Sequence, residues 1–235
     1  MGLKDKAGLE PGGLRNLLSI EVADAIPDSA IYQWDATELS LSDRDSVSSW
    51  TDEIGGLELT GAATYREAGI NEVPAVEFDG TDDTLDSDID TETQGYEVLL
   101  VAFTNRADGT SGSSLLGWDG NRGFFIVNRG GNDEEGIRSD GATELQAGDS
   151  TTEPHIWSLQ FDTTSSVIRR DGSDLGSGDA GDGDLSNTFA LGSLDDNSNF
   201  LDGRIGEVVV YDTVLSASER ADEEDRLSEK WGITV

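Results

Sequence analysis

Cysteine is absent from this 235-residue sequence, histidine occurs once, and only three residues are lysine. Without cysteine the fold has no disulfides and no thiolate metal sites, and His155 is the one imidazole available for catalysis or metal binding. The sequence also lacks a run of about 18 apolar residues, which excludes a membrane-spanning helix. The first ten residues are polar and carry no apolar stretch or cleavage signal, so we expect no secretory leader.

Positive charge is scarce as well. Lys+Arg number 15 against 49 Asp+Glu, which makes the formal net charge −34. Carboxylates at this density repel one another and weaken the compact state in dilute buffer, whereas at about 1 M salt the screening length falls to roughly 3 Å. The composition therefore predicts a protein adapted to concentrated salt, with an acidic protein of an ordinary milieu as the alternative. It argues against nucleic-acid binding, which requires a basic surface.

From residue 31 onward, strand-forming segments alternate with turns rich in Gly, Asp, Ser and Asn. Residues 98–103 and 155–161 are dominated by β-branched, aromatic and other apolar side chains, as buried strands are. Residues 173–186 are almost wholly Gly, Asp and Ser, and we expect a surface loop there. A single β-sandwich domain over residues 31–235 accounts for this pattern.

The first thirty residues differ in character from the rest. A polar, Gly-rich stretch is followed by apolar positions within residues 14–25, and Pro27 ends the segment. We interpret residues 1–30 as an arm that docks on a partner, with an ordinary extra strand packed on the sandwich as the alternative.

The C-terminal block, residues 187–233, is the most informative part of the sequence. It contains a short strand around Phe189, a polar loop, and the apolar run of residues 208–211. Ser216 then opens a helix, and Glu219 three residues later completes a capping box. Trp231 falls in the last helical turn, and Gly232 is a natural C-terminal stop.

This block is similar to the end of laminin-G-like, concanavalin-A-like jelly-roll domains. The resemblance extends over residues 30–235 through Trp34-Asp35-Ala36, residues 47–52, and the Phe78-Asp79-Gly80 turn within residues 74–83. It implies an all-β fold: a two-sheet antiparallel jelly-roll sandwich with a short C-terminal helix, preceded here by the arm. It also implies binding of sugars or surfaces and seldom cleavage.

The carboxylates do not form a recognisable catalytic pattern. Glycoside hydrolases with this jelly roll place two Glu on alternate positions of one strand, on one sheet face. Glu207 and Asp212 point to opposite faces, and Glu135 lies in a Gly/Asn-rich stretch that indicates a solvated loop. His155 begins a strand, where a structural role is expected. We therefore predict no catalytic residues and no enzyme, with a glycan-cleaving enzyme as the alternative.

Many laminin-G-like domains hold calcium at the rim of the sandwich, and the resemblance makes calcium the expected cofactor. Calcium takes six to eight hard oxygen ligands. Two loops offer such ligands, although oxygen clusters also arise by chance on so acidic a surface. The predicted metal ligands are Asp79, Asp82, Asp83, Asp195, Asp196, Asn197, Asn199 and Asp202.

A glycan site should combine an aromatic ring, which stacks on a sugar face, with nearby polar side chains. Trp118 lies in a polar, Gly-rich stretch and is the best candidate for such a site, although packing in the core is the interpretation that its own sequence context favours. Trp34, Trp50, Trp157 and Trp231 fall in strand or helix patterns and are expected in the core. The predicted glycan-binding residues are Trp118, Asp119, Asn121, Asn128, Arg129 and Asn132.

Together these inferences predict a non-enzymatic virion surface protein of a virus with a halophilic host. It would be a capsid decoration, turret or tail-fibre component that attaches to host-surface glycans or a glycoprotein. We expect a trimer or pentamer, held to other virion proteins through residues 1–30, since avidity strengthens weak sugar contacts. The alternative is a secreted or cell-surface carbohydrate-binding or adhesion module. Neither nucleic acid nor a membrane is an expected partner.

Overall fold

The computed structural model describes residues 26–105, 113–119, 122–129, 132–140, 143–194 and 198–235. Two 3-10 turns, Ala36–Glu38 and Thr163–Ser165, accompany the longer elements. These are β1 (Ala30–Asp35), β2 (Ser46–Thr51), β3 (Glu58–Ile70), β4 (Val73–Asp79), β5 (Thr84–Glu92), β6 (Tyr96–Thr104), β7 (Ser113–Trp118), β8 (Arg122–Arg129), β9 (Asn132–Arg138), β10 (Leu145–Asp149), β11 (His155–Phe161), β12 (Ser166–Arg170), β13 (Ser173–Gly178), β14 (Leu185–Leu191), β15 (Asp202–Tyr211) and α1 (Ala217–Trp231).

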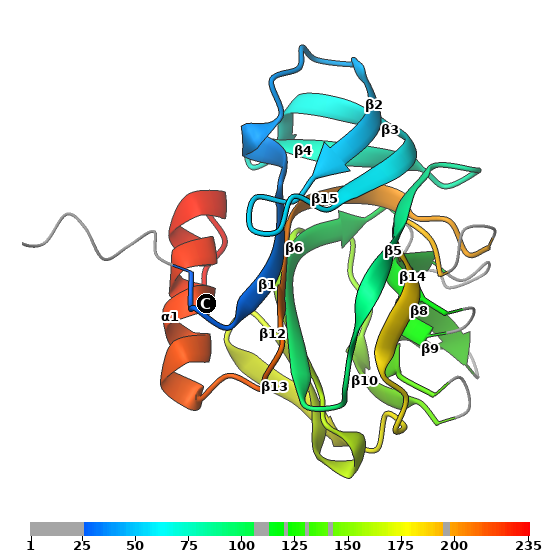
Figure 1. The fold of residues 1–235 in the computed structure, drawn as a ribbon, viewed down its shortest axis with the longest axis vertical. Helices are drawn as coiled ribbons and strands as arrows, with labels where there is room; N and C mark the ends of the chain where they lie inside the picture. Colours follow the sequence, from blue (N-terminus) through cyan, green and yellow to red (C-terminus); the bar gives the residue numbers. More distant parts are fainter. Residues whose placement is uncertain (1–25, 106–112, 120–121, 130–131, 141–142, 195–197) are drawn as a thin grey trace, which may run out of the picture.

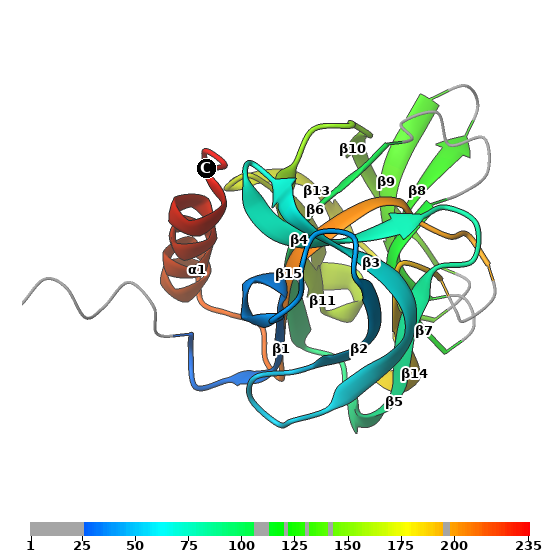
Figure 2. The same ribbon diagram turned by 90° about the horizontal axis from the view of Figure 1, so that it is seen from above.

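All strand pairs are antiparallel and form one continuous hydrogen-bonded path. The path runs β10-β9-β8-β7-β14-β5-β3-β4-β15-β6-β11-β12-β13, with β1 added to β15 and β2 to β3. Its two ends meet, because β10 packs against β13: a Cβ atom on Gly176 would lie 2.6 Å from that of Ala147. The result is a nearly closed sandwich (Figure 2). The prediction of an all-β jelly-roll sandwich with a C-terminal helix is confirmed.

The two central strands, β6 and β15, are buried on both faces, which explains their unbroken apolar runs. Leu100 pairs with Val208, and both face the main core between the sheets. Their neighbours Leu99 and Val209 are also paired and face a second core beneath α1. Figure 1 shows α1 on one side of the sandwich, with β8 and β9 on the opposite side.

Helix α1 begins and ends where the sequence predicts. The hydroxyl of Ser216 accepts a hydrogen bond from the Glu219 amide, and the Glu219 carboxylate accepts one from the Ser216 amide. Gly232 ends the helix in the left-handed conformation, with φ of 64°. Trp231 is fully buried, and its indole Nε1 donates to the Glu207 carboxylate at 3.1 Å, which fixes α1 on β15.

The few positive charges hold buried carboxylates. Glu97 is fully buried and accepts two hydrogen bonds from Arg220, at 2.5 and 2.7 Å. Every arginine whose side chain is described forms an ion pair with a carboxylate; these are Arg44, Arg66, Arg122, Arg138, Arg169, Arg170, Arg204, Arg220 and Arg226. These arginines are therefore all paired with carboxylates, and the excess negative charge remains at the surface.

The predicted surface loop at residues 173–186 is wrong in its first half. Residues 173–178 form β13, an edge strand that pairs with β12. Leu175 packs partly buried against the main core. A strand ladder is formed by backbone groups, so a segment poor in β-forming side chains joins a sheet when its neighbour offers the hydrogen bonds.

The predicted arm at residues 1–30 lies mostly outside the described residues, which begin at Ile26. Ile26 is half-buried and packs against the core beneath α1. In the described part of the chain, no helix has the length and apolarity needed to cross a membrane.

Candidate functional site

Trp118, the predicted sugar-stacking residue, is fully buried in the main core. Its ring packs edge-on against Phe161 at a centroid distance of 5.1 Å and against Tyr96 at 6.1 Å. All six positions of β7 are buried, because the backbone at Leu194 crosses the strand at Gly117 and covers its other face. The prediction that Trp118 contacts a glycan is therefore wrong.

The other predicted glycan residues are not brought together with Trp118. Asp119 is exposed, and its carboxylate pairs with the Arg122 guanidinium at 2.6 Å. This turn precedes β8, whereas the backbone pairing of Arg129 with Asn132 places the second group at the far end of that strand. Eight strand residues separate the two turns by roughly 23 Å. Asn121 and the side chains of Asn128, Arg129 and Asn132 lie outside the described part of the chain.

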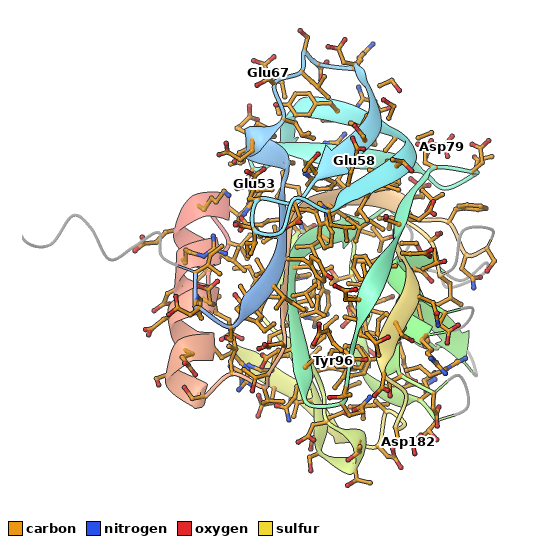
Figure 3. The ribbon with its side chains drawn as sticks, in the orientation of Figure 1. Glu53, Glu58, Glu67, Asp79, Tyr96 and Asp182 are labelled. Carbon is orange, nitrogen blue, oxygen red and sulfur yellow. The ribbon has the colours of Figure 1, made fainter. Side chains whose placement is uncertain are left out.

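One of the two loops predicted to bind calcium brings its three carboxylates together, and calcium itself stays a prediction. Asp79, Asp82 and Asp83 lie in the turn between β4 and β5, and one carboxylate oxygen from each falls within 4.8 Å of the others. Figure 3 shows Asp79 at this turn, away from α1. Burial of Asp83, together with the neighbouring charge of Asp79, raises the pKa of its carboxyl to about 6. Three carboxylates at this spacing repel one another. A calcium ion takes oxygen ligands and would relieve that repulsion.

The same carboxylates also shape the turn. Asp79 accepts hydrogen bonds from the amides of Thr81 and Asp82, at 2.8 and 3.4 Å, and Asp83 accepts one from the Asp79 amide at 3.1 Å. The second predicted loop adjoins this turn, because Asp202 pairs with Asp79 across β15 and β4. Asn199 is exposed, with φ of 55°. Asp195, Asp196 and Asn197 lie outside the described residues.

Glu135, predicted to be solvated, is fully buried on β9. Its Oε1 accepts a hydrogen bond from Arg170 at 3.0 Å, and its Oε2 has no partner among the described residues. The stretch that looks like a loop is a strand hydrogen-bonded to β8 on one edge and to β10 on the other. Burial raises the pKa of the Glu135 carboxyl to about 8; the positive charge of Arg170 opposes this rise, and Asp171 and Asp149 add to it.

The lone histidine belongs to the same group of side chains. Nδ1 of His155 lies 2.5 Å from the Asp171 carboxylate, and its ring packs edge-on against Trp157. The Arg170 guanidinium lies over the Trp157 ring, 5.4 Å from its centroid. We call Glu135, Arg170, Trp157, His155 and Asp171 the Arg170 cluster. Glu135 and Trp157 are at most 3% exposed, and Trp157 belongs to the main core, whereas His155, Arg170 and Asp171 are half-buried.

A pocket that the sequence did not indicate lies between β1 and β5, below the loop that joins β2 to β3. Its volume is about 540 Å³. We call it the Tyr32 groove; its lining residues are Ile31, Tyr32, Gly55, Gly56, Leu57, Asp88, Asp90 and Glu92. The three elements that form it can be followed in Figure 1.

Tyr32 is the aromatic side chain of this groove. It is half-buried, and its ring stacks on Trp34 at a centroid distance of 5.5 Å. Trp34 stacks in turn on Phe189 at 5.4 Å, so the core supports the exposed ring from behind. Burial raises the pKa of the Tyr32 hydroxyl, while a hydrogen bond with the Asp90 backbone acts to lower it. A rigidly backed ring is suited to stacking on an apolar face of a ligand.

The rest of the groove supplies the features that accompany such a ring. Ile31 and Leu57 are partly buried against the core and form an apolar floor. Gly55 and Gly56 keep the loop above the groove free of side chains, and a Cβ on Gly56 would meet nothing within 4 Å. The carboxylates come from β5. This combination accommodates a ring with one apolar face and several hydrogen-bonding groups at its edge.

Sequence reasoning missed the Tyr32 groove for a specific reason. Its residues come from three segments more than 50 positions apart at the extremes, so no local motif marks them. The only sequence signal is the alternation of Asp88, Asp90 and Glu92 within β5, which resembles any acidic strand of this chain. Tertiary packing decides which acidic strand meets an aromatic ring.

No family model matches the sequence, and no curated protein matches it. Among solved structures, a Trypanosoma rangeli sialidase in complex with sialic acid is similar with a TM-score of 0.63 at 15% identity, over 90% of this chain and 35% of that chain. Domain 4 of AbnA, a GH43 extracellular arabinanase from Geobacillus stearothermophilus, in complex with arabinotriose, has a TM-score of 0.55 at 17% identity, over 77% of this chain and 98% of that one. A receptor binding domain has a TM-score of 0.59 at 10% identity, over 85% of this chain and 51% of that one.

This chain thus spans about a third of the length of the sialidase and about half of the receptor-binding chain. At these identities the likeness shows the β-sandwich fold. The laminin-G-like resemblance is confirmed at that level, and the family itself stays a prediction.

The prediction that the chain is not an enzyme is contradicted by these comparisons. A sialidase and a GH43 arabinanase, both glycan-cleaving enzymes, are among the proteins that contain the same fold. The prediction rested on a resemblance to binding domains and on the absence of a paired-Glu strand motif. Neither observation separates binding from cleavage, because function depends on sites and not on the fold that carries them.

Proposed function

We propose that this protein is a carbohydrate-binding module and that a sugar ring binds in the Tyr32 groove. The observation that carries the proposal is the half-buried Tyr32 ring, backed by Trp34, in a groove with an apolar floor and carboxylate edges. The apolar face of a pyranose or furanose would stack on the ring, while Asp88 and Asp90 would accept hydrogen bonds from its hydroxyl groups.

The neighbouring structures support this proposal at the level of the fold. Two of them are complexes with a sugar, sialic acid in one and arabinotriose in the other. A third is described as a receptor binding domain. Two proteins that contain this fold therefore bind a sugar, which supports the proposal without locating a site.

Calorimetry of the full chain against a panel of oligosaccharides tests the proposal. We expect the Tyr32→Ala variant to lose about tenfold or more in affinity, since stacking and area burial are lost together. Tyr32→Phe keeps the ring and should retain most of the binding. The matched control is Phe103→Ala, another half-buried aromatic, which packs against the core beneath α1. Failure of the wild-type chain to bind any sugar, or equal binding by Tyr32→Ala, would overturn the proposal.

We further propose the setting inferred from the sequence: a module on the surface of a virion whose host is halophilic, presented in several copies. The pairing of every described arginine with a carboxylate supports the salt adaptation, because it leaves the surface charge of the chain unbalanced. A secreted or cell-surface module is the alternative. Fractionation of the native source separates the two, since only the first places the protein in purified particles as an oligomer. Deletion of residues 1–28 should then release the protein from the particles.

A further inference from the structure

The Tyr32 groove carries negative charge, and the described residues that line it include no cation. Asp88, Asp90 and Glu92 line it from one strand, and none of its eight lining residues is basic. Asp88 and Asp90 are exposed, and Glu92 is half-buried. Burial raises the pKa of the Glu92 carboxyl, and the charges of Asp212 and Asp90 raise it further. Each added negative charge in the groove therefore costs free energy, and a positive group would relieve it.

Two other pockets of similar volume show the contrast. The pocket of about 530 Å³ beside α1 contains Arg226 and Lys230, both paired with Glu207. The pocket of about 570 Å³ near β3 contains Arg66 and Arg204, both paired with Glu77. Each of these pockets therefore has two cations among its three carboxylates, whereas the lining of the Tyr32 groove has carboxylates alone. The Tyr32 groove combines an aromatic ring with three carboxylates. One of them, Asp88, accepts a hydrogen bond from the Thr188 hydroxyl at 3.2 Å.

We propose that the Tyr32 groove selects a sugar bearing a protonated amino group, such as a glucosamine unit, over neutral and acidic sugars. This inference rests on the proposed function, because it needs the sugar ring to stack on Tyr32. The ammonium group of the bound ring would lie beside Asp90 and Glu92 and donate charge-assisted hydrogen bonds to them. A carboxylated sugar would meet three like charges and be rejected.

The decisive comparison uses two trisaccharides that differ only in whether the 2-amino groups are free or acetylated. The glucosamine trimer is cationic at about pH 6, and the N-acetylglucosamine trimer is neutral and otherwise similar in shape. We expect the cationic trimer to bind about tenfold or more tightly at about 0.1 M salt, with the ratio shrinking at about 1 M salt as the charges are screened. Sialyllactose should bind more weakly than either trimer.

Variants assign the selectivity to the groove and not to the net charge of the chain. Asp90→Asn should lower the affinity ratio of the two trimers by about threefold or more. Glu153→Gln removes one exposed carboxylate from a turn outside the groove, makes the same change in net charge, and should leave the ratio unchanged. Tyr32→Ala should weaken both trimers together.

The outcomes distinguish the two proposals. Equal affinity for both trimers, lost in Tyr32→Ala, would overturn the inference and leave the proposed function standing. Binding of neither trimer, nor of any other sugar, would overturn both. The inference would also be overturned if trilysine bound as tightly as the glucosamine trimer and Tyr32→Ala had no effect. The groove would then bind cations without recognising a sugar.

Discussion

Replacing Glu135 by glutamine should abolish a loss of stability that the wild type suffers between about pH 5 and pH 8. Burial raises the pKa of the Glu135 carboxyl to about 8 in the folded protein, from an ordinary value of 4.5. Between these two values the folded state keeps the proton and the unfolded state has released it. Rising pH therefore favours unfolding, and the stabilisation present below the unfolded-state pKa is lost as pH rises through the folded-state pKa.

The size of the effect follows from that interval. One pH unit of differential protonation corresponds to about 1.4 kcal/mol, so the range from 4.5 to about 8 sets an upper bound of about 5 kcal/mol on the decrease that Glu135 causes in the free energy of unfolding. Glutamine cannot ionise, and its carbonyl oxygen can still accept the hydrogen bond from Arg170. The charged groups that face Glu135 are Arg170, Asp171 and Asp149, with His155 beside Asp171.

Urea denaturation of the wild type and Glu135→Gln at a series of pH values and constant salt measures this directly. The quantity of interest is the difference between the two unfolding free energies, because groups that titrate in both proteins cancel. We expect the difference to move by about 2–5 kcal/mol in favour of Glu135→Gln between pH 5 and pH 8.5. A flat difference would refute the reasoning, since it would mean that Arg170 keeps Glu135 ionised at neutral pH.

Glu77→Gln is the matched control with the opposite sign. Burial acts to raise the pKa of the Glu77 carboxyl, but hydrogen bonds from Arg66 and Arg204 outweigh burial and lower it. Its stabilisation is present above the ordinary pKa of 4.5 and is lost as pH falls. The difference between wild type and Glu77→Gln should therefore be flat above about pH 5 and change only in acid.

Three further predictions concern the metal, the helix and the salt. Calcium should lower the pKa of Asp83 from about 6, which NMR can follow. It should also raise Tm more than magnesium does at equal ionic strength. Equal responses to the two ions would leave no dedicated site at Asp79, Asp82 and Asp83. Gly206→Ala should destabilise the protein by about 1–3 kcal/mol in urea denaturation, because a Cβ there would lie 2.5 Å from the Trp231 ring; an unchanged midpoint would show that α1 shifts freely. Tm should rise steadily from about 0.1 M to 3 M salt in thermal melts, and a flat series would end the halophilic interpretation.

The sequence alone determined the features that depend on local chemistry. Residues 98–103 and 208–211 form strands buried on both faces, and an unbroken apolar run is the signature of such strands. The capping box at Ser216 and the stop at Gly232 appear as expected, because a helix terminus is satisfied by side chains within a few positions. The turn at Phe78-Asp79-Gly80 likewise brings Asp79, Asp82 and Asp83 together by chain proximity.

Tertiary structure decided which residues face solvent and which meet. Trp118 is buried because Tyr96 of β6 and Phe161 of β11 pack against its ring, and the buried carboxylate of Glu135 meets Arg170 of β12. Nothing near either residue in the sequence encodes these remote partners. The Tyr32 groove likewise needs β1, the loop before β3, and β5 to converge. Local pattern sets the period of a strand, whereas the pairing of remote strands sets the exposure of each face, and the exposed faces are where ligands bind.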